Sequence, residues 1–575
     1  MFCVAFALSL LAGRLIQLEG LDSAQYKTAA EQQQLEQITI PAVRGEITTS
    51  DGMVLAMTVQ TDTVIADPEQ IPPSMRPAVA DRLAGPLGLP AQQILGLLNY
   101  RTGSQYQPLA ENVPVATGNR ISTMRPSLPG ISLTPSYTRA YPTGELASNV
   151  VGVTNNSGPG GSMQGVAGLE EQYNSVLAGR PGSEEVEEGI DGEPIPLTEA
   201  KLTPVVPAES LRLTIQSYLQ NEADQECKAR VLTDHARDCS IIVMTRTGQI
   251  LAMAQWPTFN PAGSFSFSQT TNISVADVFA PGSTLKPVSI AAALERGGQT
   301  PMSAYTVPST IKMDGLYTFQ DAEPHPTVRY TIAGILAHSS NVGMVQVVQH
   351  ITPLQQYDYL RAFGLGSVSG VNMAGPNVES PGLLPKPGSA GYWPDNEFEY
   401  SFGQGLSVTA IQMASVYATI ANGGIRVTPT IVAGTVSDNG VFTPAPRPAS
   451  RRVIQAKTAR ELMTMLQQVP EIDAQAGEPW GLIPGYTVAA KTGTAQVSGP
   501  GLGKCLCQYG SSYIGIAPAD NPQLIVAVNI QDPRGKYYGD EVAGPAFFDV
   551  MKFALQTLKI PPDYAKTPYI RLTAP

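Results

Sequence analysis

The segment Ala280-Pro281-Gly282-Ser283-Thr284-Leu285-Lys286-Pro287 decides how this chain is interpreted. A helix-forming run, residues 288–295, follows it, so Ser283 is expected near the N-terminus of a helix. Residues three apart on a helix share one face, and the hydroxyl of Ser283 should therefore meet the amine of Lys286. A serine attacks carbonyl groups only when a base takes its proton, and a lysine can do so when burial or a second cation lowers its pKa. Taken alone, this spacing is more typical of a capping serine beside a surface lysine.

Two later segments change that balance. Ser339-Ser340-Asn341 follows an apolar helical stretch, and Lys491-Thr492-Gly493-Thr494 follows the strand-like residues 488–490. In isolation the first is a polar helix end and the second an edge-strand turn. Active-site serine acyl-transfer enzymes carry three motifs in this order: S-x-x-K, then a serine and an asparagine separated by one residue, then K-T-G. The three segments together predict acyl transfer through Ser283.

The residue types of the third segment indicate a peptide substrate. Gly493 would let an extended chain lie close beside the strand, while Thr494 offers a hydroxyl and a backbone N–H. The N–H groups of Ser283 and Thr494 are expected to hold the oxyanion that develops during acyl transfer. Lys491 would supply positive charge for a carboxylate and would lower the pKa of Lys286.

Composition limits the classes of protein that this chain can be. Its 575 residues exceed the usual size of one hydrophobic core, so two or more domains are expected. Hydrophobic residues make up 43% and charged residues 15%, which is typical of a globular protein. With 36 basic and 48 acidic residues, a net charge of −12 and no long basic run, nucleic acid is excluded as an expected partner.

The five cysteines do not have the spacing of a metal site. The pairs Cys227 with Cys239 and Cys505 with Cys507 lack the repeated spacing of zinc ligands. A disulfide in either pair is compatible with a location outside the cytoplasm, although a bridge between Cys505 and Cys507 would be strained. We predict no metal and leave the state of the cysteines open.

The N-terminus carries an apolar run from Phe2 to Ala12 that resumes after Arg14. It is shorter than the roughly 20 residues of a spanning helix, and no small-residue cleavage site follows it. It is either a buried helix or the outer end of a transmembrane helix that starts upstream of Met1. The catalytic motifs favour the second alternative, so residues 1–20 are predicted to be a membrane anchor.

The rest of the chain divides in two. Residues 21–206 contain short alternating stretches broken by Gly and Pro, which predicts an elongated, strand-rich domain. The Glu- and Pro-rich stretch 184–207 indicates an exposed hairpin or linker, and we place the boundary there. Residues 207–575 are predicted to be a mixed α/β (α+β) domain. Its clearest expected elements are helices at 218–231 and 410–421 and strands at 240–245, 249–254 and 524–530.

At this point the chain resembles the class B penicillin-binding proteins along nearly its whole length. Similar motifs in the N-terminal half are Arg44-Gly45-Glu46-Ile47, Arg139-Ala140-Tyr141-Pro142 and Gly165-Val166-Ala167-Gly168-Leu169-Glu170. Similar motifs in the second half are Phe402-Gly403-Gln404-Gly405, Asn422-Gly423-Gly424 and Tyr538-Gly539. The resemblance implies a central antiparallel sheet flanked by helices, standing on a non-catalytic pedestal of the dimerisation-domain type.

The resemblance also implies a function. Such enzymes are D,D-transpeptidases that cross-link peptidoglycan stem peptides with release of terminal D-Ala, and β-lactams acylate their serine. Carried over, Ser283 is the nucleophile and Lys286 its base, Ser339 and Asn341 relay protons and hold the substrate amide, and Lys491, Thr492 and Thr494 bind the terminal carboxylate. No cofactor is required.

The stretch 106–121 and the residues around Pro129-Gly130-Ile131 look more like division-type than elongation-type members. The expected partners are a SEDS-family glycan polymerase and other division proteins at the cytoplasmic membrane, with the catalytic domain outside the cytoplasm.

Three alternatives share the acylation machinery. A serine β-lactamase needs a base for deacylation, and no convincing Glu partnered by Asn lies between Ser339 and Lys491. A D,D-carboxypeptidase would use water as acceptor, which the long pedestal disfavours. A β-lactam sensor or scaffold would bind the drug without turnover, yet the chain keeps the Lys and Asn of its motifs.

Overall fold

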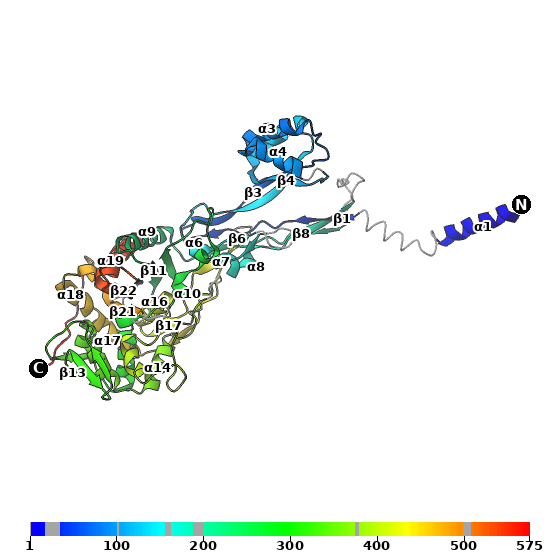
Figure 1. The fold of residues 1–575 in the computed structure, drawn as a ribbon. Helices are drawn as coiled ribbons and strands as arrows, with labels where there is room; N and C mark the ends of the chain where they lie inside the picture. The colour runs from blue at the N-terminus through cyan, green and yellow to red at the C-terminus, as the bar shows by residue number, and fades with distance from the viewer. Residues whose placement is uncertain are drawn as a thin grey trace.

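The computed structural model describes residues 2–17, 35–100, 103–155, 163–187, 201–373, 379–497 and 508–575. Figure 1 shows an elongated molecule, in which a compact body formed by the second half of the chain continues into two extended arms. Cys505 and Cys507 lie outside the described residues.

A five-stranded antiparallel sheet forms the centre of the body. Its order is β12-β11-β23-β22-β21, so β21 lies at an edge. The strands are β11 (Asp238–Thr245), β12 (Ile250–Trp256), β21 (Ala489–Val497), β22 (Gln508–Ala517) and β23 (Leu524–Gln531). The predicted strands at 240–245, 249–254 and 524–530 are confirmed to within two residues.

Helices cover both faces of this sheet because its strands are apolar on both sides. Along β11, Ile241 and Val243 belong to the core beneath α9 (Ser217–Thr233) and α19 (Gly539–Thr557). The alternate residues Ile242 and Met244 belong to a second core, which contains all the large apolar side chains of α16 (Ala410–Ala421). The helices predicted at 218–231 and 410–421 are α9 and α16.

The other elements of the body form a helical layer with three short two-stranded sheets. The helices are α10 (Ile273–Ala276), α11 (Lys286–Arg296), α12 (Ile332–Ala337), α13 (Asn341–Val348), α14 (Pro353–Ala362), α15 (Asn396–Glu399), α17 (Ala456–Leu466) and α18 (Gln468–Gln475), with 3-10 turns η4 (Phe267–Thr270), η5 (Gly282–Leu285), η6 (Tyr400–Phe402) and η7 (Pro479–Gly481). The paired strands are β13 (Ala304–Val307) with β16 (Val328–Thr331), β14 (Thr310–Met313) with β15 (Tyr317–Gln320) and β17 (Ile425–Val427) with β20 (Ser450–Arg452).

A second sheet joins the two halves of the chain. Its strands are β2 (Ile47–Thr48), β3 (Val54–Ala66), β4 (Gln107–Pro114), β5 (Ile131–Ala140), β10 (Ser210–Leu213), β18 (Val432–Val436) and β19 (Phe442–Pro444). Strand β10 pairs in parallel with β2 and antiparallel with β18. Backbone hydrogen bonds therefore continue across the boundary predicted near residue 207.

The described parts of the Glu- and Pro-rich stretch, residues 184–187 and 201–207, belong to the lower arm in Figure 1, and residues 188–200 lie outside the described residues. Strand β8 (Gly182–Glu187) pairs antiparallel with β1 (Leu35–Ile40) on one side and with β9 (Lys201–Thr203) on the other. The described ends of the predicted hairpin thus lie side by side.

The N-terminal half contains helices that its short alternating stretches did not predict. At the tip of the upper arm, α3 (Arg76–Leu87) and α4 (Ala91–Tyr100) form a small head (Figure 1), and α5 (Val115–Met124) shares its hydrophobic core through Ile121. Val79 and Leu83 of α3, and Ile94 and Leu98 of α4, recur at helical spacing and belong to one buried core with Val64 of β3. Both helices are short, so their apolar stripes are weak signals in the sequence.

Short elements surround the junction of the arms: β6 (Thr154–Asn155), β7 (Gln164–Gly165), α6 (Ser148–Val151), α7 (Gly168–Gln172) and α8 (Asn174–Leu177). The predicted anchor is a helix, α1 (Phe2–Ile16). Within the residues that the structure describes, no helix combines the length and hydropathy needed to cross a membrane.

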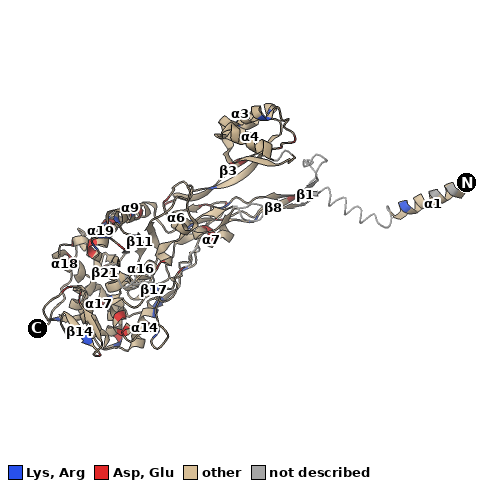
Figure 2. Ribbon diagram, viewed as in Figure 1, with Lys and Arg blue, Asp and Glu red and all other residues tan. Residues whose placement is uncertain are grey.

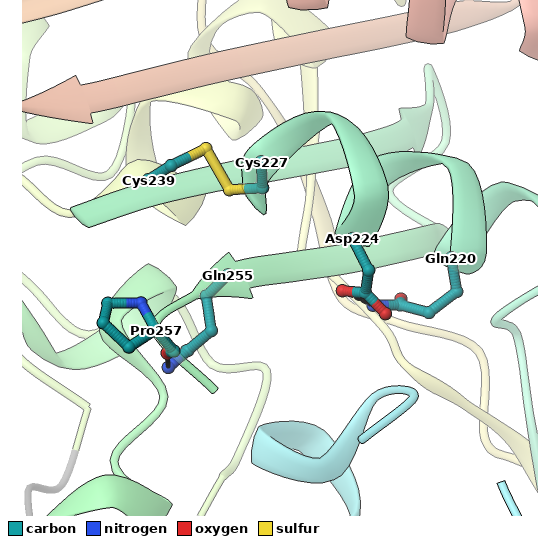
Figure 3. The surroundings of a disulfide bond; sticks show 6 residues. All are labelled: Gln220, Asp224, Cys227, Cys239, Gln255 and Pro257. Atoms are coloured by element: carbon teal, nitrogen blue, oxygen red, sulfur yellow. Dashed lines mark hydrogen bonds between the residues drawn. A yellow bond between two sulfur atoms is a disulfide. The ribbon is translucent and has the colours of Figure 1, made fainter. Parts of the chain in front are cut away.

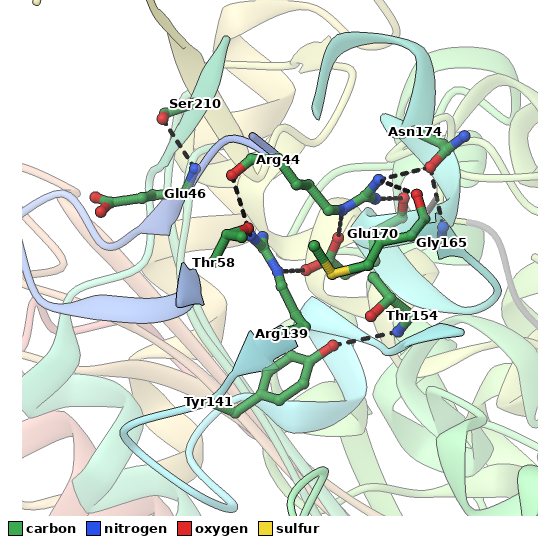
Figure 4. A network of polar contacts seen from close by, with 11 residues as sticks. Arg44, Glu46, Thr58, Arg139, Tyr141, Thr154, Gly165, Glu170, Asn174 and Ser210 are labelled. Carbon is green, nitrogen blue, oxygen red and sulfur yellow. Dashed lines mark hydrogen bonds and ion pairs between the residues drawn. The ribbon is translucent and has the colours of Figure 1, made fainter. Parts of the chain in front are cut away.

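The three N-terminal motifs meet in one buried ion network, shown in Figure 4. The Nε atoms of Arg44 and Arg139 each donate to a different carboxylate oxygen of Glu170, both at 2.7 Å. Arg44 also donates to Asn174 Oδ1 at 2.8 Å. Motifs up to 126 residues apart are therefore connected in the N-terminal half of the chain.

Cys227 and Cys239 form a disulfide that ties α9 to β11 (Figure 3). This resolves one of the two cysteine pairs that the sequence left open. Figure 2 shows acidic residues on α19 and α7 and basic residues on α3 and β14, so charges of both signs are spread along the molecule.

Candidate active site

Ser283 lies in the 3-10 turn η5, directly before α11, and is partly exposed. Two glycines bring this turn against the loop that contains Gly403. Gly282 has a φ of 55° and its N–H donates to the carbonyl oxygen of Gly403 at 3.0 Å. A Cβ on Gly403 would lie 2.1 Å from the carbonyl oxygen of Gly282, so no side chain fits there. The position of the serine therefore depends on a contact between two backbones.

Lys286 is the first residue of α11, and its side chain is fully buried. Residues three apart are eclipsed on a 3-10 turn, which keeps Ser283 and Lys286 on the same side. The Nζ atom of Lys286 donates to the carbonyl oxygen of Ser339 and, at 3.2 Å, to its Oγ. Burial, together with the positive charge of Lys491, holds the pKa of Lys286 well below its usual range. A proton on this amine is therefore easily lost.

The segment Ser339-Ser340-Asn341 is the turn between α12 and α13. Ser339 has a φ of 56°, in the left-handed region that side chains other than glycine rarely adopt. Ser340 is the N-cap of α13, and its Oγ accepts from the N–H of Gly343 at 2.8 Å. Asn341 Nδ2 is 3.5 Å from the carbonyl oxygen of Gln320 and is only partly buried. The turn thus directs Ser339 inward to the lysine and leaves the amide of Asn341 near the surface.

Lys491 lies on the edge strand β21 and is also fully buried. Its Nζ donates to the carbonyl oxygen and to the Oγ1 of Thr492, at 3.2 and 3.3 Å. Burial lowers the pKa of Lys491 to about 8, against the opposing effect of the carboxylates of Asp473 and Asp540. Two buried lysines therefore lie close enough for one charge to affect the other.

Gly493 is where the serine turn meets the edge strand. A Cβ on Gly493 would lie 2.9 Å from the Cγ2 of Thr284 and 3.0 Å from the carbonyl oxygen of Pro281. The next residue, Thr494, accepts a hydrogen bond at its Oγ1 from the N–H of Gly539 at 3.0 Å. The structure thus brings the α12–α13 turn and β21 together beside η5, the turn that carries Ser283.

Some residues of the site carry no signal in the sequence. Tyr417 is fully buried on α16 and donates its hydroxyl to the carbonyl oxygen of Thr284 at 2.9 Å. Asp321 bonds the α12–α13 turn, and Asp473 acts electrostatically on Lys491. None belongs to one of the three segments, and only the folded arrangement identifies them.

Comparison with known proteins agrees with this architecture. The model of the penicillin-binding protein transpeptidase domain matches residues 239–552, and that of the penicillin-binding protein dimerisation domain matches residues 39–213. The chain belongs to the penicillin-binding protein transpeptidase family and is a transpeptidase enzyme.

Two named relatives are similar to this chain over nearly its whole length. The penicillin-binding protein PbpB of Mycolicibacterium smegmatis is 33% identical over 93% of this chain and 85% of that protein. The peptidoglycan D,D-transpeptidase FtsI of Escherichia coli K12 is 32% identical over 98% of this chain and 92% of that protein.

Solved structures share the fold. A peptidoglycan synthetase from Bifidobacterium adolescentis matches with a TM-score of 0.75 at 28% identity, covering 94% of this chain and 100% of that one. Penicillin binding protein 3 of Mycobacterium tuberculosis, complexed with aztreonam, matches with a TM-score of 0.70 at 28% identity and the same coverage.

Proposed function

We propose that this chain is a peptidoglycan D,D-transpeptidase that cross-links stem peptides through an acyl-enzyme on Ser283. One observation carries the proposal. Lys286 is buried three residues from Ser283, donates to Ser339 and lies within the electrostatic influence of Lys491. An amine in such surroundings is a base that can activate a serine at neutral pH.

In the first half-reaction, Ser283 Oγ attacks the carbonyl carbon of the penultimate D-Ala while Lys286 Nζ takes the hydroxyl proton. The oxyanion of the tetrahedral intermediate is held by the N–H groups of Ser283 and Thr494. The peptide bond to the last D-Ala then breaks, and a proton relayed through Ser339 completes the leaving amine. The products are an ester on Ser283 and free D-Ala.

In the second half-reaction, an amine of a neighbouring stem peptide attacks the ester carbonyl. The new peptide bond forms as the bond to Ser283 Oγ breaks, and the proton lost by the amine returns to the serine through Lys286. Net charge and proton count are unchanged over the cycle.

The edge strand β21 is the proposed substrate platform. Its outer edge is free of a sheet partner within the described residues, so an extended peptide can add to it as a further strand. Lys491, Thr492 and Thr494 would bind the terminal carboxylate, Gly493 would let the peptide approach, and Asn341 would hold the substrate amide. β-Lactams present a carboxylate and a reactive amide in a similar arrangement, so they should acylate Ser283.

We further propose that the enzyme acts in septal wall synthesis. The names of the relatives, FtsI and PbpB, support this assignment, as do the division-type motifs. Residues 1–20 would anchor the chain in the cytoplasmic membrane, 21–206 would form the pedestal, and 207–575 would form the extracytoplasmic catalytic domain. A SEDS-family glycan polymerase and other division proteins would contact the anchor and the pedestal.

The test is intact mass after incubation with a penicillin, followed over time for the wild-type chain, Ser283→Ala and Lys286→Ala. We expect a long-lived adduct of one drug molecule on the wild type and none on Ser283→Ala, with formation on Lys286→Ala slowed by at least about 100-fold. The absence of an adduct on folded wild type would overturn the proposal. An adduct that clears within minutes would indicate a β-lactamase, and a cross-linking assay with stem peptides separates a transpeptidase from a carboxypeptidase or a sensor.

A further inference from the structure

Asp321 follows strand β15 and belongs to none of the three motifs, yet its carboxylate holds the first turn of α13. Oδ2 accepts from the Oγ of Ser340 at 2.7 Å, and Oδ1 accepts from the N–H of Val342 at 2.9 Å. The Oγ of Ser340 in turn accepts from the N–H of Gly343. Two of the N–H groups that a helix leaves unpaired at its start are thus satisfied, one by Asp321 and one by the serine that Asp321 orients.

This contact bears on the residue just before it. Ser339 is held at a φ of 56°, which costs a non-glycine residue free energy that the surrounding structure must supply. In that conformation its carbonyl oxygen and its Oγ both accept hydrogen bonds from the Nζ of Lys286. Ser340 is buried and the side chain of Asp321 is only 9% exposed, so the hydrogen bonds of Asp321 to the first turn of α13, here called the clamp, are shielded from water. Asp321 is therefore connected to the base through two intervening residues.

The carboxylate of Asp321 also acts on the lysine through its charge. It raises the pKa of Lys286, against the lowering by burial and by Lys491 of β21. Asp321 is itself faced by His325 of its own loop, whose Nε2 lies 2.9 Å from Oδ2, and it acts on Tyr330 of β16. The hydrogen bond with the carbonyl oxygen of Pro326 and the contact with Asp321 raise the pKa of His325, which favours a positive charge on the imidazole beside this carboxylate.

We propose that Asp321 is a positioning residue of the acylation step. It clamps the first turn of α13 and so holds Ser339 in the position where it accepts hydrogen bonds from Lys286. This inference rests on the proposed function, because it assigns Asp321 a part in the same reaction. The role is distinct from proton transfer, since Asp321 contacts neither Ser283 nor the proposed substrate platform within the described contacts.

The experiment measures the second-order rate constant of acylation by a penicillin between pH 5 and 9 in the full chain. Asp321→Ala removes both hydrogen bonds and the charge. Asp321→Asn keeps an oxygen for the N–H of Val342, but it removes the charge and places an NH2 donor where Oδ2 accepts from the Oγ of Ser340. The matched control is Asp314→Asn, the same change of charge at the exposed tip of the β14–β15 hairpin.

For Asp321→Ala we expect acylation to slow by about 10- to 100-fold, because displacement of a catalytic group by about 1 Å has effects of that size. For Asp321→Asn we expect a smaller loss of acylation rate. We also expect the acid limb of the pH profile, where the rate falls because Lys286 is protonated, to move to lower pH, because Lys286 gives up its proton more readily without the carboxylate. Asp314→Asn should match the wild type.

Wild-type rates and an unmoved acid limb in both Asp321 variants would overturn the inference. Equal losses in both variants with an unmoved limb would reduce Asp321 to a purely structural residue and would also overturn it. If wild type itself forms no adduct, the proposed function fails instead. Asp321→Asn conserves the shape of the side chain, so it keeps the inference testable if Asp321→Ala does not fold.

Discussion

At the scale of single residues, the site is a pair of buried lysines that differ in their surroundings. Burying an ammonium group costs free energy unless an opposite charge or hydrogen bonds compensate for it. Lys491 has the carboxylates of Asp473 and Asp540 nearby, which favour its charged form. Lys286 donates to the neutral oxygens of Ser339, and burial together with the positive charge of Lys491 outweighs the opposing effect of Asp321 on its pKa. This asymmetry favours Lys286 as the base and Lys491 as the cation that binds a carboxylate.

The pKa of Lys491 predicts an alkaline limb in the acylation profile. Lys491 is protonated below its pKa of about 8 and becomes neutral above it, so its attraction for the carboxylate of a penicillin should be lost as the pH rises through that value. The acylation rate, measured from pH 6 to 10, should therefore fall above about pH 8. In Lys491→Arg the guanidinium stays charged, so a slower enzyme without this limb is expected. A limb that persists unchanged in Lys491→Arg would show that another group causes it.

At the scale of elements, glycines decide how closely the parts of the site approach one another. The serine turn η5 packs against β21 at Gly493 and against the loop of Gly403. Neither contact leaves room for a Cβ next to the backbone. The helix and strand patterns in the sequence place these elements along the chain, while the glycines let them come together.

Gly403→Ala should slow acylation of Ser283 by at least about tenfold. The new Cβ would meet the carbonyl oxygen of Gly282 at 2.1 Å, and the turn that carries Ser283 would have to move. Gly423→Ala is the matched control, because Gly423 also has a positive φ, 63°, but nothing lies within 4 Å of its added Cβ. The measurement is the rate of penicillin adduct formation in both variants. Equal rates in the two would contradict a role for this close contact.

At the scale of the whole molecule, the two halves of the chain form one continuous structure. The second sheet contains β2 to β5 from the N-terminal half and β10, β18 and β19 from the second half. One hydrophobic core contains Ile47 and Leu177 together with Ile242 and Leu285. The serine turn, through Leu285, therefore packs into the same core as parts of the N-terminal half.

Glu170→Gln should lower the free energy of unfolding by about 3–5 kcal/mol, because it leaves the buried guanidinium groups of Arg44 and Arg139 without a counter-charge. Urea unfolding of the full chain measures this change. Glu171→Gln removes the same charge from the next residue, which is exposed, and should change stability by less than about 0.5 kcal/mol. Equal effects of the two substitutions would show that the buried network contributes little.

The sequence by itself determined the features that depend on neighbours along the chain. The spacing of Ser283 and Lys286, the helix at 410–421 and the strand at 524–530 follow from local geometry, since a helix or strand repeats every few residues. The order of the three motifs indicated the enzyme class before any contact between them was known. Short amphipathic helices such as α3 and α4 were missed because a stripe of two or three apolar residues is a weak signal.

Only the tertiary structure decided what depends on partners far away in the chain. It brought Ser339 to Lys286, which is 53 residues away in the sequence, and Glu170 to Arg44, which is 126 residues away. It also paired Cys227 with Cys239 and revealed Asp321 beside Ser340. It also carried one sheet across the predicted domain boundary. Such pairs are set by the free energy of packing the whole chain, which depends on all the buried surfaces at once and leaves no local pattern from which each pair can be read.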